Sequence, residues 1–62
     1  MTFYVVMVED IHDHLYTPRV AGDGRVMDFD EAEKHRQMMQ TAAEMNYEAS
    51  GLHYFLAEIK RA

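Results

Sequence analysis

The stretch TFYVVMVE, residues 2–9, decides the fold of this chain. β-Branched and aromatic residues dominate it, a composition typical of a β-strand. Alternate residues of a strand point to opposite faces, and here both sets are apolar. They are Phe3, Val5 and Met7 on one face, and Tyr4, Val6 and Val8 on the other. A half-solvated antiparallel strand would alternate apolar with polar residues, so this pattern predicts a strand that is covered on both sides.

A second stretch of the same kind, LHYFLAEIK, closes the chain at residues 52–60. Leu52, Tyr54 and Leu56 alternate there with Phe55, Ala57 and Ile59. The sequence therefore predicts a last strand with two apolar faces, like the first.

The segment between the first strand and the helix predicts an irregular hairpin. Residues 10–14 are polar and indicate a loop, whereas Leu15–Val20 has strand composition but contains Pro18. Proline lacks an amide hydrogen, so this strand is expected at a sheet edge. Two glycines in residues 21–24 favour a tight turn, and Arg25–Phe29 is expected to form a short strand returning from it.

An amphipathic helix is expected from about Asp30 to Asn46. Asp28 or Asp30 can cap its amino end, and Glu31 in the first turn suits the helix dipole. One broad arc of the helical wheel is largely apolar and predicts the side that lies on the sheet. It comprises Ala32, His35, Met38, Met39, Ala42, Ala43 and Met45.

These elements predict one α+β domain over residues 1–62: a small antiparallel sheet in β-hairpin, α, β order, with one amphipathic helix on one face. One helix covers only one face, yet both long strands are apolar on two. We therefore expect a homodimer formed through the sheet, by face packing or by edge pairing. The alternative is that long side chains and residues 10–20 fold over the second face.

Composition and charge narrow the function. The 62 residues include no cysteine, eleven acids and six bases, for a net charge of −5. The absence of disulfides fits a cytoplasmic protein, and no apolar run approaches the length of a membrane span. The negative charge argues against direct binding to nucleic acid or to an anionic membrane, and favours a basic protein surface as the partner.

Two groups of residues are candidates for a site. Acidic residues flank the hairpin and are expected to form a partner-binding surface, with helix capping and solubility as the alternative; they are Asp10, Asp13, Asp23, Asp28, Asp30 and Glu31. His12 and His14, with Asp10, are interpreted as part of a solvated loop without a metal, and a metal site with these residues as ligands is the alternative. The sequence holds no nucleophile motif, phosphate-binding loop or nucleotide fingerprint, so we expect neither an enzyme nor a cofactor.

The pattern GRVMDFDEAEKHRQMM, followed by YFLAEIK, resembles a layout common in small phage and prophage proteins. The resemblance covers Gly24–Lys60 and brings no site residues with it. It implies a bacterial or phage cytoplasmic setting, where small acidic proteins often inhibit host machinery, as anti-CRISPR and other anti-defence proteins do. The sequence thus predicts a protein that occludes a basic, nucleic-acid-binding surface of a larger host protein. The alternatives are a metal-binding protein or metal-dependent enzyme, and a structural subunit of an assembly.

Overall fold

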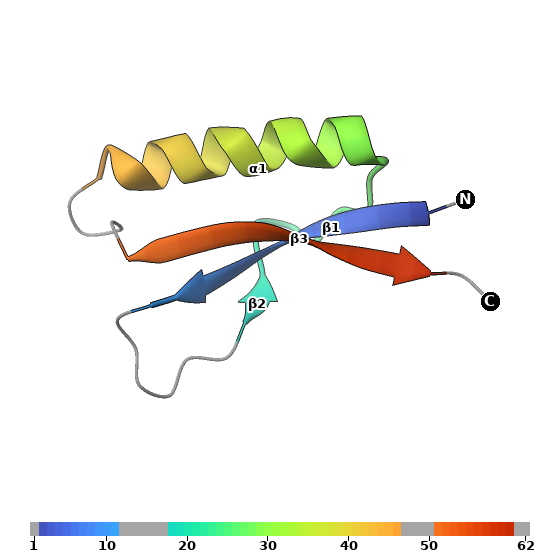
Figure 1. The fold of residues 1–62 in the computed structure, drawn as a ribbon, viewed down its shortest axis with the longest axis horizontal. Coiled ribbons are helices and arrows are strands. Elements are labelled where there is room, and N and C mark those ends of the chain that lie inside the picture. The colour runs from blue at the N-terminus through green and yellow to red at the C-terminus, as the bar shows by residue number, and fades with distance from the viewer. Residues whose placement is uncertain (1, 12–17, 47–50, 61–62) are drawn as a thin grey trace.

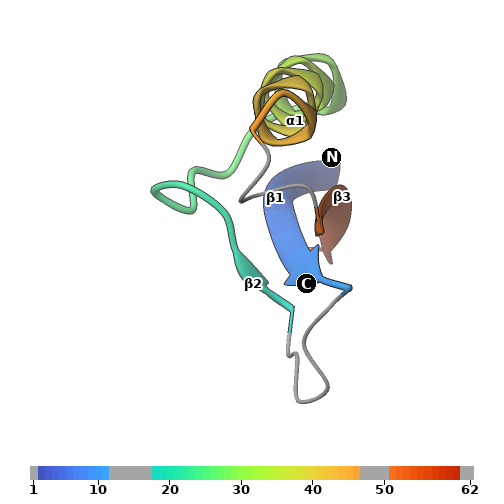
Figure 2. The same cartoon turned by 90° about the vertical axis from the view of Figure 1, so that its left-hand side faces the viewer.

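The computed structural model describes residues 2–11, 18–46 and 51–60, and in them the chain forms a two-layer α+β fold. Strand β1 spans Thr2–Asp10, β2 Arg19–Val20, helix α1 Phe29–Glu44 and β3 Leu52–Lys60. The sheet has the order β2-β1-β3, and both outer strands run antiparallel to β1. Figures 1 and 2 show α1 lying over one face of this sheet. The predicted fold class, with one helix on one face, is confirmed.

The register of β1 and β3 separates their residues into two faces. Pairing runs without a break from Thr2 opposite Lys60 to Asp10 opposite Leu52. The even-numbered residues pack toward α1, where a hydrophobic cluster joins the two layers. It contains Val6, Val8, Ala21, Met27 and Ala32, with Tyr4, Met39, Leu52, Tyr54 and Leu56 packed against it. The odd-numbered residues therefore point to the face without the helix, which we call the outer sheet face.

The most deeply buried side chains of the core between the layers are small. Val6 is 1% exposed and Ala32 is fully buried. Among the residues that the structure describes, Val6 is the largest with an exposure below 2%. Small residues at the centre of this interface let the helix and the sheet approach closely, but each of these residues contributes little apolar area.

The pairing along the second edge of β1 differs from the expected hairpin. Val20 pairs with Met7, and Met27 then pairs with Tyr4 on the same edge. Arg25–Phe29 is therefore not a strand returning against the preceding one; the chain loops out after Val20 and rejoins β1 for a single bridge. Of the strand expected at Leu15–Val20, Arg19–Val20 is present, and residues 12–17 lie outside the described residues.

A glycine-rich turn and burial explain this path. Gly22 and Gly24 have φ of 62° and 73°, the left-handed region that glycine adopts without steric cost. Asp23 Oδ1 accepts a hydrogen bond from the Arg25 amide at 3.1 Å, which fixes the turn. Because Met27 bridges to β1, its side chain lies beneath the helix and is 5% exposed. On a strand beyond β2, the same side chain would be in water.

Helix α1 starts at the expected cap and ends two residues earlier than expected. Asp28 is the N-cap, and its Oδ1 accepts a hydrogen bond from the Glu31 amide at 2.9 Å. Ala32 and Ala43 are buried against the sheet, but Met38 and Met45 are 71% and 83% exposed. The expectation that these two methionines face the sheet was wrong, because the contact stripe is narrower than the apolar arc of the wheel.

Candidate functional surfaces

The acidic residues expected to form one surface lie in two places. Asp28 caps α1 and is followed by Asp30 and Glu31 in its first turn. This end of the helix lies beside the start of β1, where the rings of Tyr4 and Phe29 are 5.4 Å apart.

Asp10 lies at the opposite end of β1, paired with Leu52. Six residues of extended chain separate it from Tyr4, a length of about 20 Å. Asp13 lies outside the described residues. The structure therefore brings together Asp28, Asp30 and Glu31, which we call the acidic junction, and places Asp10 away from them (Figure 1). Asp23 lies in the turn before the helix, next to Gly22, which lies against the Met39 side chain.

Local bonds hold the acidic junction in shape. The carboxylates of Asp23 and Asp28 each accept a backbone amide, as described above. Glu31 forms an ion pair with Arg25, at 2.9 Å between Oε1 and Nη2, with side chains that are 40% and 60% exposed. The carboxylates thus order the loop and the helix start, and Arg25 offsets one of the three negative charges of the junction.

The solvent side of α1 carries a shallow, mainly apolar groove, and the sequence pattern had assigned its Met38, Ala42 and Met45 to the side that faces the sheet. It is lined by Gln37, Met38, Thr41, Ala42 and Met45.

One signal in the sequence indicates which side of the helix carries this groove. Ala32 and Ala43 are eleven residues apart, so they lie within about 20° on a helix of 3.6 residues per turn. Small residues that recur on one line mark the closest approach to the sheet, and Met38 lies about 120° from Ala32 around the axis.

The outer sheet face is apolar along most of its length. It carries Phe3, Val5 and Met7 from β1, Phe55, Ala57 and Ile59 from β3, and Val20 beside Met7. Val20 is 50% exposed. No described helix or strand lies over this face, and Figure 2 shows the helix on the other side of the sheet.

A single cross-strand pair adds charge at one end of this face. His53 Nδ1 lies 3.0 Å from Glu9 Oε1. The imidazole also stacks on Phe55, with ring centroids 6.1 Å apart and an interplanar angle of 29°. Within β1 and β3, the ionisable groups of this face are thereby confined to one end, where they contact each other.

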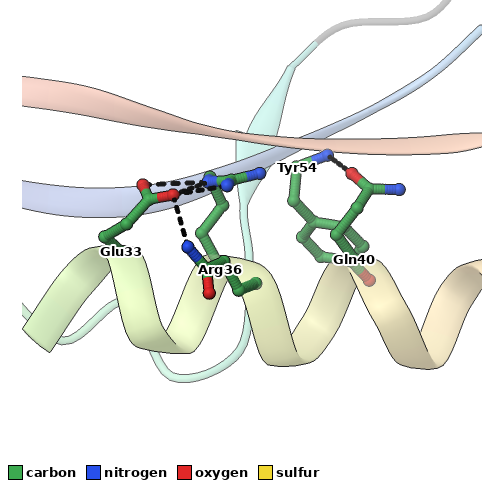
Figure 3. Close-up of polar contacts among 5 residues, drawn as sticks. Glu33, Arg36, Gln40 and Tyr54 are labelled. Carbon is green, nitrogen blue, oxygen red and sulfur yellow. Dashed lines mark hydrogen bonds and ion pairs between the residues drawn. The ribbon is translucent and has the colours of Figure 1, made fainter.

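Gln40 joins the helix to the free edge of β3 (Figure 3). Its Nε2 donates to the Leu52 carbonyl at 3.1 Å, and its Oε1 accepts from the Tyr54 amide at 2.8 Å. A neighbouring strand would satisfy the same two backbone groups, so the side-chain amide replaces such a strand at the start of the edge. Figure 3 also shows the Glu33–Arg36 pair one turn earlier in the helix. The hydrogen bond from Arg36 lowers the pKa of Glu33.

The candidate metal ligands remain a prediction. His12 and His14 lie outside the described residues. Within residues 2–11, 18–46 and 51–60, no group of three or more histidine, aspartate or glutamate side chains is arranged to hold a metal ion. In the same residues, no helix is long and apolar enough to cross a membrane.

Comparisons of this chain with protein-family models, with curated proteins and with solved structures find no match.

Proposed function

We propose that this chain is a protein-binding module that acts by docking on a larger protein, not by catalysis. The observation that carries the proposal is the groove on the solvent side of α1. There, Met38 and Met45 are 71% and 83% exposed. Methionine is common on binding surfaces because its flexible side chain and polarisable sulfur adapt to the contours of a partner.

The polar groups support binding over chemistry. Several of those that the structure describes are engaged in holding the fold together: Asp28 caps the helix, Gln40 braces β3 and Asp23 fixes a turn. Such groups maintain the shape of a surface, whereas a catalytic group must be free to reach a substrate. The helix surface therefore offers apolar contact area with charge at one end.

The acidic junction indicates the charge of the partner. It lies at the amino end of the same helix and retains negative charge after Arg25 pairs with Glu31. With a net charge of −5, the chain is attracted to basic surfaces. We propose a partner whose apolar side chains enter the groove and whose basic residues face Asp30.

The finer proposal concerns the partner's identity and the outcome of binding. A basic, nucleic-acid-binding surface on a host protein has the charge that the acidic junction fits, and a bound chain would block it sterically. The module would then act as an inhibitor, as the resemblance to small phage proteins implies.

Differential capture from a bacterial lysate tests the groove. The bait proteins are the native chain, the double variant M38Q/M45Q, which keeps side-chain length but adds polarity, and V26T, which adds polarity at another half-exposed apolar residue outside the groove. We expect a captured protein that the double variant loses by at least about tenfold, a change of about 1.4 kcal/mol. Equal capture by the native chain and M38Q/M45Q would exclude the groove.

Charge reversal tests the acidic junction. Asp30→Lys and Glu44→Lys make the same charge change at exposed positions near opposite ends of α1. We expect Asp30→Lys to slow association with the captured protein, more so at low salt, and Glu44→Lys to have little effect. Equal association rates for the two variants would show that the junction does not contact the partner.

A further inference from the structure

We infer that the outer sheet face is covered by a second copy of this chain, packed face to face. The face carries three rows of side chains, from β3, β1 and β2, and the apolar members were given above. A sheet that is apolar on both faces requires a layer on each side, and α1 supplies one of them.

Charge identifies the occupant as another copy. Two copies with a net charge of −5 each repel one another unless their contact surface is free of unpaired charge. Among the residues of β1 and β3, Glu9 is the single acid on the outer face, and it lies at one end of that face, 3.0 Å from His53 and away from the apolar centre. The acidic junction belongs to the helix layer, so a copy on the outer face stays clear of it. A basic partner would find no complementary charge at the centre of this face.

Shape supports the same occupant. Two sheets pack about 10 Å apart with their strands nearly aligned, because each has the same hand of twist. A second copy supplies a sheet with the same twist and the same strand lengths. The nine residues of β1 and of β3 give a face about 30 Å long and about 10 Å wide, and the two residues of β2 add a third row only beside Met7 and Val8.

The area of that face sets the expected strength. It amounts to about 300 Å² per copy, or about 600 Å² in the dimer, compared with about 1,200–2,000 Å² for a stable interface. We therefore expect a weak dimer that dissociates on dilution.

The position of the Glu9–His53 pair sets the relative direction of the two copies. If the strands of the two sheets ran parallel, both Glu9–His53 pairs would meet at one end of the interface. In an antiparallel stacking, each Glu9–His53 pair lies beyond the apolar end of the other copy, which is the end that carries Phe3 and Ile59. The structure thus favours a twofold axis near the middle of β1 and β3, with Phe55 and Ala57 near the centre of the contact.

This inference deepens the proposed function, because the dimer would present two α1 grooves on its outside. It is tested with the purified chain alone, so its failure leaves the docking proposal standing, and a failed capture experiment leaves the dimer standing.

Light scattering after gel filtration across a range of protein concentrations measures the dimer. Phe55→Lys adds a charge to the outer sheet face, and Met38→Lys makes the same change to an apolar side chain on the helix groove. We expect the native chain and Met38→Lys to dimerise with rising concentration, and Phe55→Lys to stay monomeric with a native circular dichroism spectrum. A native chain that is monomeric at every concentration, or a dimer lost with Met38→Lys and kept with Phe55→Lys, would overturn the inference.

Cross-linking gives an answer even where Phe55→Lys fails to fold. The chain contains no cysteine, so Ala57→Cys on the outer sheet face and Ala42→Cys on the helix can be compared with a short bis-maleimide reagent. We expect covalent dimers from Ala57→Cys and few from Ala42→Cys. The reverse result would refute packing through this face. Linkage at Ile59→Cys as strong as at Ala57→Cys would refute the antiparallel direction.

Discussion

The two faces of the β1–β3 pair have the same composition and different environments. On the inner face, Val6 and Val8 are 1% and 7% exposed beneath the helix. On the outer face, Met7 and Phe55 are as apolar, yet no described element covers them. The comparison shows that apolar alternation predicts which faces of a sheet must be covered. Whether the monomer itself covers them depends on the number of layers in its fold.

The difference has an energetic consequence. Burial of apolar surface contributes about 25 cal/mol per Å², and the monomer gains most of it on the inner face. On the outer face Val5 is already 8% exposed among its neighbours, and burial of the larger side chains around it requires a partner. The inner face therefore stabilises the fold of the monomer, and the outer face is expected to make stability depend on protein concentration.

The largest expected effect on stability distinguishes two neighbouring residues of β1, Val6 and Met7. Val6→Asp places a carboxylate in the buried core, at a cost of several kcal/mol. A domain of this size is stable by only about 3–9 kcal/mol, so we expect Val6→Asp to be unfolded by circular dichroism. Met7→Asp, one residue along the strand, should remain folded at low concentration and lose the dimer. If both variants unfold, the outer face is as essential to the monomer as the inner one.

A smaller effect concerns the attachment of the helix to the inner side of β3. Gln40→Ala removes both hydrogen bonds to the edge of that strand, and we expect the free energy of unfolding to fall by about 1–3 kcal/mol. Gln37→Ala, one turn earlier and exposed, should cost less than about 0.5 kcal/mol. Urea denaturation at one fixed protein concentration measures both. Equal effects would show that the Gln40 brace adds nothing to the inner layer.

The smallest effect is a pH dependence on the helix. Arg36 lowers the pKa of Glu33 in the folded chain below its ordinary value of 4.5. The contribution of this pair is therefore present at neutral pH and is lost as the pH falls below about 4.5 and through the lowered folded-state pKa. Because the pair is solvent-accessible, we expect a small change. Tm measured at pH 7 and pH 3 should fall slightly less in Glu33→Gln than in the native chain; the same fall in both would contradict the assignment.

Local chemistry allowed much of this fold to be predicted. Asp28 was a candidate cap and is the N-cap, and both long strands were located from their β-branched and aromatic residues. Those signals act over a few residues, so a sequence pattern contains them. Within the candidate site, the acidic residues next to one another in the chain stayed together, whereas Asp10 did not join them.

The errors came from contacts between distant residues. Arg25–Phe29 has the composition of a strand, but its path depends on the edge of β1 that remains free beside β3. Met38 and Met45 fall on an apolar arc, but the line of closest approach follows Ala32 and Ala43. The helical wheel gives the direction of each side chain and not the width of the surface that the sheet covers.

The sequence by itself determined where the two long strands and the helix lie, how the helix begins, and that both faces of the strands are apolar. Only the tertiary structure decided which face receives the helix, which methionines stay in water, and that Gln40 closes the start of the β3 edge. The physical reason is range. Propensity, capping and alternation act between near neighbours in the chain, whereas the choice of face depends on pairing between residues some fifty positions apart.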